Sequence, residues 1–428
     1  MIKSFECKGY WFLPNNPNRK ISGILKYIPN EILKLELIGS FGEKMLEDFL
    51  HTEEVAVIHG ITSENKKVTL FHCFPGGSCH IESSFSLRNY SVKYCLVGCY
   101  LADEKDLLFN KISVKTLLLN LFYKPQVIQK DFKLNEKNII KEINFSLLTD
   151  AAKKSCDYDI GSNYFIHFSS SASVDENRSG NQIELTQNAN FTIEKRGEKT
   201  DVLSLIYKTH LFLEFISLAA MRSDRITDVA LYGIDNPSVN NKQPVKLYFI
   251  DHDIPLNYDN RAHEFIFRYE DIADVFQYTI KYWYDVDENI EPIRSHLISS
   301  IKDKEIFDTL DFLTLVQALE GYHRRFENSG RLKLKDRLER LVEKFSDIDK
   351  VRNSNYPLEA IVQSRDYYSH FFDKDEKPLL LSHIELLKQT VQLRLLLISC
   401  TLHLIGFDNQ KINNMLNRTY NNKLRLIE

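Results

Sequence analysis

The chain has 428 residues, 43% of them hydrophobic and 27% charged, so it can bury large cores and should form two or three units rather than one domain. Its net charge is only −4, so any contact with nucleic acid would depend on local clusters of cations rather than on total charge. The seven cysteines are odd in number and widely scattered, which argues against a disulfide framework and fits a reducing compartment.

No run of 18 apolar residues is present. The longest candidate, residues 391–405, is interrupted by Gln392, Arg394 and His403, so a buried helix is predicted there rather than a membrane span. Residues 1–6 include an acid and lack the hydrophobic core of a secretory signal. We therefore expect a cytoplasmic protein with no membrane partner.

From residue 1 to about 130, short β-branched or alternating runs are separated by Gly, Pro, Asn and Asp. Residues 55–58, 67–71 and 92–97 are examples. This pattern predicts mainly antiparallel strands.

Two Cys-His pairs surround a turn in this first region. They are His72 with Cys73 and Cys79 with His80, and thiolates with imidazoles would suit Zn²⁺. Their spacing matches no common zinc module, so a hairpin with free thiols is favoured over a zinc site. We assign no metal and no cofactor.

Residues 131–200 continue as predicted strands, with a loop expected at the polar span 169–182. A helix is predicted for 201–221, because apolar residues recur there at helical spacing, and further strands for 229–232 and 246–250. Residues 1–265 therefore form a β-rich region, which the pattern allows to divide into subdomains of about 1–130 and 131–265.

After residue 265 the pattern is helical throughout. Helices are predicted for 272–284, 290–301, 307–328, 332–345, 358–372 and 379–405. The predicted fold class is thus α+β and multidomain, with a β-rich N-terminal region followed by an all-α helical bundle over 266–428.

Near the end of one predicted helix lie Arg365, Asp366 and His370. Cleavage of RNA without a metal needs a base for the ribose 2′-OH, a fixed cation at the phosphorane oxygens and a proton donor for the leaving oxygen. Histidine titrates near neutrality and can serve as base or acid, and the guanidinium fork of arginine matches phosphate geometry. His370 is the only histidine in the chain with an arginine five to seven positions upstream.

The spacing of these residues limits what one helix can do. Residues five apart are rotated by roughly 140°, so Arg365 and His370 should not share a face, and one helix would make half of a site that a symmetric dimer completes. Asp366 and His370 are four apart and do share a face, so the carboxylate is expected to orient the imidazole or to shape the site.

Several neighbours could support this site or bind RNA. Glu320, His323 and Arg324 lie three and four apart on one predicted helix and could form an ionic network, with direct catalysis by His323 less favoured. Tyr367 and Tyr368 could stack on unpaired bases, although at least one is expected to pack in the bundle. A cluster of cations provides either an RNA-binding face or an ordinary solvated face: Arg324, Arg325, Arg331, Lys333, Lys335, Arg337 and Arg340.

These motifs resemble those of a known family. Arg365-Asp366-x-x-x-His370 is similar to the R-x4-6-H motif of HEPN domains, and residues 312–325 contain a pattern similar to the QALE-x-YHRR helix of the ApeA-like HEPN family. Residues 5–14, 21–25 and 37–41 resemble the start of the β-rich domain of that family. The resemblance extends over nearly the whole chain and places a HEPN domain at about 300–428.

The resemblance implies a metal-independent endoribonuclease of abortive infection against phage, active as a homodimer or higher oligomer through the HEPN domain. His370 would be the general acid/base, Arg365 would stabilise the phosphorane, and products from RNA, tRNA among the candidates, would carry 2′,3′-cyclic phosphate and 5′-OH ends. The N-terminal region would sense a phage-derived trigger. Two alternatives stay open: a non-catalytic HEPN module that binds RNA or protein, and a toxin that an antitoxin blocks by nucleotidylation of Tyr367 or Tyr368.

Overall fold

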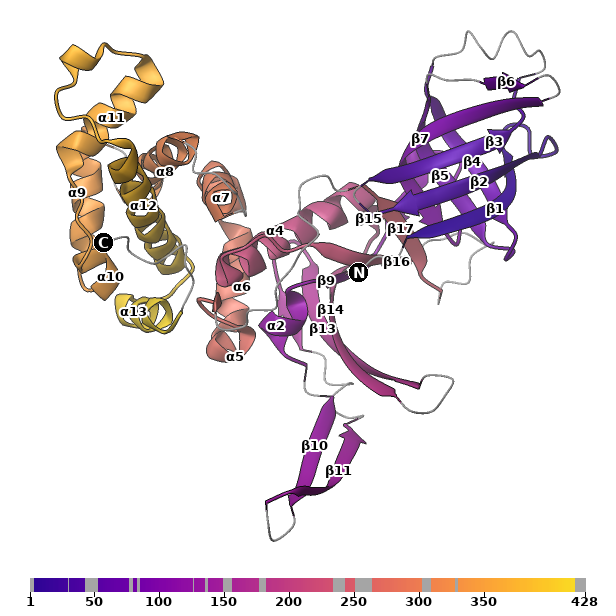
Figure 1. Ribbon diagram of the computed structural model, residues 1–428, viewed down its shortest axis with the longest axis horizontal. Helices are drawn as coiled ribbons and strands as arrows, with labels where there is room; N and C mark the ends of the chain where they lie inside the picture. Colours follow the sequence, from indigo (N-terminus) through magenta and orange to yellow (C-terminus); the bar gives the residue numbers. More distant parts are fainter. Residues whose placement is uncertain are drawn as a thin grey trace.

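The structure is a computed structural model. It describes residues 4–29, 31–42, 53–76, 80–82, 85–125, 127–134, 138–148, 156–176, 182–233, 243–250, 264–301, 309–327 and 330–419. A β-rich N-terminal region is followed by a helical region (Figure 1), which confirms the fold class predicted from the sequence.

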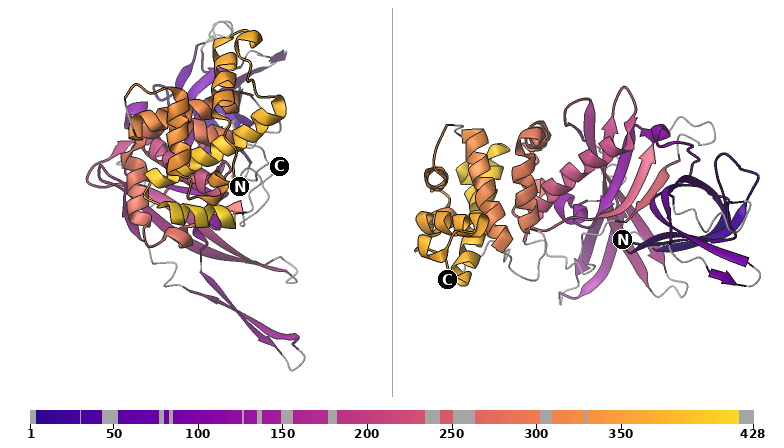
Figure 2. Two further views of the ribbon diagram at one scale, coloured as in Figure 1. Left: turned by 90° about the vertical axis from the view of Figure 1, so that its left-hand side faces the viewer. Right: turned by 90° about the horizontal axis from the view of Figure 1, so that it is seen from above.

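The first strands close into an antiparallel barrel, seen end-on in the right-hand view of Figure 2. Its strands follow the order β7-β3-β2-β1-β4-β5, and β5 pairs with β7 to close the ring. They are β1 (Phe5–Phe12), β2 (Ile21–Ile28), β3 (Ile32–Ile38), β4 (Val55–Thr62), β5 (Lys67–Pro75) and β7 (Phe85–Val97), with β6 (His80–Glu82) paired to β7.

A separate hydrophobic core fills the barrel. Trp11 is fully buried there, and a Cβ atom at Gly60 would lie 2.3 Å from its indole ring, so the strand beside the ring needs glycine at this position. Inward-facing residues alternate with exposed ones along β3, as the period of two predicts.

A second sheet extends from the far half of β7. The order runs β7-β17-β16-β9-β14-β13-β12, and each pair of neighbouring strands is antiparallel. Its strands are β9 (Lys111–Thr116), β12 (Asp157–Asp159), β13 (Tyr164–Glu176), β14 (Ile183–Lys195), β16 (Ile226–Tyr232) and β17 (Val245–Phe249). A small ladder joins β8 (Leu108–Phe109) to β15 (Thr200–Asp201), and a short 3-10 turn, Glu104–Asp106, precedes it.

The prediction of a loop at residues 169–182 is wrong for residues 169–176, which belong to β13. Ser169 pairs with Asn190, and the ladder continues to Glu176 opposite Ile183, while residues 177–181 lie outside the described ones. Serine-rich sequence misled the prediction because this part of β13 and β14 leaves the core, so the apolar alternation that marks a half-buried strand is absent. A separate hairpin of β10 (Ile128–Leu134) and β11 (Ile140–Leu147) projects nearby (Figure 1).

Helix α4 (Val202–Ala220) lies across the second sheet, with the short α2 (Leu119–Tyr123) beside it. Asp201 caps its first turn by accepting a hydrogen bond from the Ser204 N–H at 2.8 Å. In the described part of the chain α4 is the one helix long and apolar enough to cross a membrane, and 61% of its apolar window is buried. Core helices are usually buried in this way, so the length and composition of α4 do not by themselves indicate a membrane span.

The remaining helices form the C-terminal bundle. They are α5 (Tyr269–Ile272), α6 (Phe276–Asp285), α7 (Asp287–Ile301), α8 (Thr309–Tyr322), α9 (Leu334–Lys344), α10 (Asp349–Arg352), α11 (Leu358–His370), α12 (His383–Leu404) and α13 (Asn409–Arg418). Helix α8 contacts α7, α9, α11 and α12. The sequence pattern did not predict α10 or α13, because the first is a single turn and the second is short and mostly polar.

One continuous core joins the second sheet, α4 and the bundle. At the junction the Trp283 Nε1–H donates to the Leu211 carbonyl at 2.8 Å, and the Tyr284 hydroxyl donates to the Lys208 carbonyl at 2.7 Å. The helical region is therefore fastened to the second sheet through α4, while the barrel keeps its own core.

Candidate active site

Helix α11 carries the motif on its last two turns. Pro357 stands at the N-cap, where a missing N–H is harmless, and the helix ends at His370 because Phe371 takes a left-handed conformation with φ of 56°. The Phe371 N–H then donates to the Tyr367 carbonyl at 3.1 Å. His370 is exposed on the final turn, and its ring meets Phe372 edge-on at 6.1 Å.

Arg365 and His370 contact each other within one chain. Arg365 Nη1 lies 3.3 Å from His370 Nε2, although the rotation between the two positions predicted different faces. The long arginine side chain spans the angle, and His370 sits at the open end of the helix. Because arginine can only donate, this contact is a hydrogen bond in the tautomer of the ring whose Nε2 carries no proton.

The expected pairing of Asp366 with His370 is not formed. Asp366 instead accepts from Arg365 at 3.1 Å and from Lys377 at 3.2 Å. Lys377 comes from the segment that folds back along α11, where Leu379 N donates to Gln363 Oε1 at 3.0 Å. Asp366 therefore positions the arginine rather than the histidine, because two cations attract it more strongly than a neutral ring does.

Helix α8 adds the second carboxylate of the site. Glu320 lies 3.5 Å from Arg365 and 2.8 Å from Arg324, its neighbour one turn on. Arg365 and Glu320 are each 24% exposed in their side chains, so the pair is partly screened by water. Of the network predicted for Glu320, His323 and Arg324, the Glu320–Arg324 pair is present and reaches the motif through Arg365, whereas His323 bonds Arg337 instead.

His323 lies in a π-helical turn, His323–Glu327, that continues α8. It is 2% exposed, and its Nδ1 accepts from Arg337 Nη1 at 3.0 Å. Burial, with the Arg337 charge beside it, lowers the pKa of His323, so the ring stays neutral and joins α8 to α9. His323 supports the bundle and is not placed to meet a substrate.

The two tyrosines differ in their surroundings. Tyr368 packs against the main core, which is the continuous core of the second sheet, α4 and the bundle. Tyr367 is half-buried, and its ring meets the Tyr368 ring edge-on at 4.9 Å. Tyr368 is thus the one that packs in the bundle. Arg325 is exposed and donates to the Asn289 carbonyl of α7 at 2.5 Å, so it braces the helices.

The basic cluster is smaller than the sequence indicated, because Arg337 turns inward and is 1% exposed. Lys335 pairs with Glu359 at 3.1 Å. The cations that remain exposed beside α8 and α9 are Arg324, Arg325, Arg331, Lys333, Lys335 and Arg340. They lie on the continuation of α8, on α9 and on the segment between them, with the exposed acids Glu339 and Glu343 among them on α9.

The possible zinc ligands do not converge where they are described. His72 turns outward to Glu54 and Glu104, while Cys73 points into the barrel, as neighbours on a strand must. Burial raises the pKa of the Cys73 thiol. Cys79 lies outside the described residues, as does the side chain of His80. Among the residues that the structure describes, no group of three or more His, Cys, Asp or Glu side chains is placed to hold a metal.

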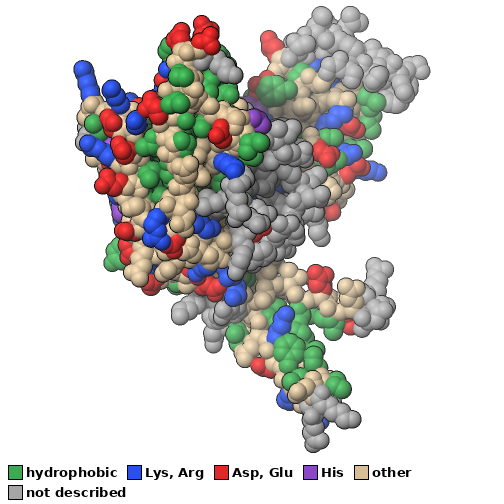
Figure 3. Space-filling view, turned by 60° about the vertical axis from the view of Figure 1, so that its left-hand side comes forward, with side chains coloured by type: hydrophobic (Ala, Val, Ile, Leu, Met, Phe, Trp, Pro, Cys, Tyr) green, Lys and Arg blue, Asp and Glu red, His purple; other side chains and the backbone are tan. Residues whose placement is uncertain are grey.

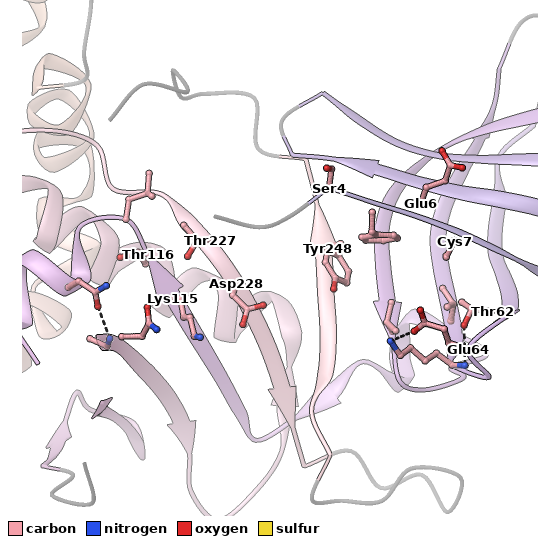
Figure 4. Close-up of a pocket in the computed structure, with 18 residues that line it drawn as sticks. Ser4, Glu6, Cys7, Thr62, Glu64, Lys115, Thr116, Thr227, Asp228 and Tyr248 are labelled. Atoms are coloured by element: carbon pink, nitrogen blue, oxygen red, sulfur yellow. Dashed lines mark hydrogen bonds and ion pairs between the residues drawn. The ribbon is translucent and has the colours of Figure 1, made fainter. Parts of the chain in front are cut away.

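A cavity of about 710 Å³ lies between the barrel and the second sheet (Figure 4), and no sequence motif predicted it. Its wall includes Glu6 and Cys7 on the barrel side and Lys115 and Asp228 on the sheet side. Burial, with Glu64 nearby, raises the pKa of Cys7 to about 11, so this thiol is a poor nucleophile at neutral pH. Strands far apart in sequence form this wall, which is why no local motif marks it.

Comparison with known proteins covers both regions. A family model described as ApeA N-terminal domain 1 matches residues 6–283, and one described as Apea-like HEPN matches residues 313–411. No curated protein and no solved structure matches the chain. The first match spans the barrel and the second sheet, the second spans α8 to α12 with the motif, and together they confirm the resemblance seen in the sequence.

Proposed function

The chain belongs to the ApeA family of HEPN proteins, and on that premise we propose that it is an endoribonuclease of anti-phage defence that cleaves RNA without a metal. The observation that carries the proposal is the contact of 3.3 Å between Arg365 Nη1 and His370 Nε2 at the surface of the HEPN region. It brings a permanent cation and a proton acceptor to one point, as attack by a ribose 2′-OH requires.

In the proposed reaction, His370 Nε2 takes the proton of the 2′-OH, and the oxygen attacks the adjacent phosphorus. Arg365 turns from the histidine to the phosphorane oxygens, whose charge it matches. The 5′-oxygen leaves with a proton from a protonated histidine, and the products are a 2′,3′-cyclic phosphate and a 5′-OH. One chain offers one such histidine, so His370 of a second copy supplies the leaving-group proton in a dimer.

The carboxylates around Arg365 hold it ready. Glu320 at 3.5 Å and Asp366 at 3.1 Å fix the guanidinium, and Lys377 offsets part of the Asp366 charge. An arginine fixed in advance loses less rotamer freedom when the phosphate arrives. The exposed cations along α8 and α9 would then hold the RNA backbone.

The test is cleavage of total cellular RNA and of tRNA in EDTA by the purified protein, with and without phage lysate as the trigger. His370→Ala should abolish cleavage and Arg365→Ala should reduce it strongly, whereas Arg352→Ala, which removes an exposed cation outside this network, should retain it. Mapping of the ends should give cyclic phosphates. Equal activity of wild type and His370→Ala would overturn the proposal.

One observation favours a second candidate, a HEPN module that binds RNA or protein without cleaving it. Two carboxylates already neutralise Arg365, so its role could be to hold α8 against α11. RNA binding measured by fluorescence anisotropy separates the two. The nuclease predicts that His370→Ala binds RNA and fails to cut it, whereas the binding module predicts no cutting by any variant.

The β-rich region is proposed to sense the trigger in the cytoplasm and to hold the nuclease in check. The open cavity between barrel and second sheet supports this, because a bound trigger there would contact both units at once. Lys115→Glu reverses a charge in the cavity wall, far from α11 in sequence and in Figure 1. It should weaken activation by phage lysate, and unchanged activation would place the trigger elsewhere.

A further inference from the structure

The β10–β11 hairpin has one apolar face. The register sets Phe132 opposite Ile143 and Leu134 opposite Ile140, with Phe145 and Leu147 two and four residues beyond Ile143. Cross-strand partners and alternate residues share a face, so these six side chains form a single surface, called here the hairpin face. Lys130, opposite Phe145, is a charged residue on this face, and Lys141 stands at the register shift between the Lys133–Glu142 and Leu134–Ile140 pairs.

The hairpin face is open to solvent. Its six side chains are between 45% and 55% exposed, and none of them belongs to the barrel core or the main core. Figure 3 shows hydrophobic side chains gathered on the projecting hairpin. With about 200 Å² for each large side chain in full exposure, the six leave roughly 600 Å² of apolar surface in water. The largest apolar patch of a typical monomer is about 300–600 Å².

The opposite face of the hairpin satisfies itself. Lys133 pairs with Glu142 at 2.9 Å, and Asn144 donates to the same carboxylate at 3.0 Å. Gln129 donates to Asp131 at 3.5 Å. The polar face therefore needs no partner.

In the part of the chain that the structure describes, hydrogen bonds at the root fix the hairpin to the body. The N–H groups of Val127 and Ile128 donate to Gln187 Oε1 of β14 at 2.8 and 2.9 Å, and Leu148 N donates to the Val127 carbonyl at 2.8 Å. Beyond these bonds the ribbon stands clear of the second sheet (Figure 1). An isolated two-stranded hairpin is at best marginally stable in water, so its apolar face needs a cover.

We propose that the hairpin face packs against the hairpin face of a second copy of this chain. Two arguments select a second copy. A standard interface buries about 800 Å² per partner, of which a little over half is apolar, and the hairpin face alone supplies roughly 600 Å² of apolar area. The face also has almost no charge, so identical faces meet without the repulsion that two charged faces would suffer.

The resulting contact is isologous. Two antiparallel sheets pack face to face at about 10 Å, and each Phe132 and Phe145 is buried against the same residues of the other copy. This contact lies in the N-terminal region, outside the HEPN region, and does not depend on whether the site cleaves RNA. With a second interface through the HEPN region, the chain would assemble beyond a dimer.

The first test is the mass of the full-length protein over a range of concentrations, measured by mass photometry and sedimentation. In one variant an Asn-Gly turn replaces residues 129–146, which keeps the Ile128–Leu147 pair at the root. Its main species should have half the mass of the wild-type species. The matched control, Asn144→Lys on the polar face, should keep the wild-type mass. A deletion variant with wild-type mass at every concentration overturns the proposal.

The second test identifies the partner surface. Ile143→Lys/Phe145→Lys and Ile143→Glu/Phe145→Glu should each lose the association, because like charges then face one another. Mixed in equal amounts, the two variants should associate again, since lysines meet glutamates only if the hairpin face packs on itself. Loss without recovery on mixing would show that another surface or another protein covers the face. Circular dichroism checks that every variant is folded.

Discussion

Two arginine-centred clusters in this protein are built from the same parts and differ in burial. Arg365, in the HEPN region, contacts Glu320 and Asp366, and its side chain is 24% exposed. Arg294, at the junction of the two regions, contacts Glu214 of α4 at 2.6 Å and Asp287 of α7 at 2.7 Å, and its side chain is 3% exposed. The arginine is partly open to water in the first cluster and buried in the second, where Asp287 is also buried and Glu214 is 31% exposed.

The difference shows how burial separates chemistry from architecture. Burial raises the pKa of the Glu214 carboxyl, although the charge of Arg294 opposes this rise. Burial also disfavours the charge of Arg294, but Glu214 and Asp287 outweigh it and keep the pKa of the guanidinium raised. Tyr207 donates to Asp287 at 2.6 Å and completes the cluster. Carboxylates of α4 and α7 both hold the buried Arg294, so this cluster joins the two helices. The open cluster can exchange its partners for phosphate.

The largest expected effect is on the junction. Arg294→Met leaves the buried Asp287 and the partly buried Glu214 without their cation and should lower the free energy of unfolding by about 3–5 kcal/mol. Urea unfolding followed by circular dichroism measures it. Arg352→Ala, which removes an exposed ion pair to Asp349, is the matched control and should cost at most about 1 kcal/mol.

A triple variant sharpens this result. Arg294→Met combined with Glu214→Gln and Asp287→Asn removes all three charges, so it should recover a large part of the lost stability. If the single variant is as stable as the control, the junction cluster does not hold the two regions together.

The second effect concerns rate rather than stability. Arg365→Ala should reduce RNA cleavage by roughly 10²–10³-fold, as removal of a transition-state donor does, while the free energy of unfolding falls by at most about 1 kcal/mol. Arg365→Lys keeps the charge but loses the guanidinium fork, and should recover only part of the rate. A large loss of stability without loss of cleavage would reverse the roles assigned to the two clusters.

The same contrast explains what the sequence could predict. Arg365 and His370 were identified because local spacing and a family motif mark them, and the helical bundle because its apolar period is long and regular. Arg294 and Glu214 are 80 residues apart, so no local pattern joins them. The pairing of Asp366 with Arg365 and Lys377 instead of His370 depends on a folded-back segment, and the inward turn of Arg337 depends on the buried His323. Sequence spacing cannot show either.

The third effect is a pH dependence in the β-rich region, from the buried carboxyl of Asp224, to which backbone N–H groups donate. Asp224 accepts from the N–H groups of Leu118 and Arg225 at 2.9 and 2.7 Å, and burial raises its pKa to about 6 from an ordinary value of 3.8. The fold therefore favours the protonated form. Its contribution to stability is fully present below pH 3.8 and is lost as the pH rises through about 6.

Over that range the loss should amount to about 3 kcal/mol, which unfolding in urea at several pH values would measure. Asp224→Asn keeps an acceptor oxygen and cannot ionise, so the difference between wild type and variant should grow from pH 4 to pH 6 and then level off. A constant difference would mean that Asp224 is ionised in the folded protein at all these pH values.

The smallest effect tests the open cluster from its edge. Lys377 lies 3.2 Å from Asp366, with 17% of its side chain exposed, and its Nζ lies 4.4 Å from the centre of the Phe372 ring. Lys377→Ala leaves Asp366 to Arg365 alone, so the guanidinium is held more tightly and is less free to turn to phosphate. Cleavage should fall by roughly two- to fivefold, equivalent to about 0.5–1 kcal/mol. Each contact with a phosphate adds to the salt dependence of RNA binding. If Lys377→Ala lost as much cleavage as Arg365→Ala and its RNA binding depended less on salt, Lys377 would instead contact the RNA backbone directly.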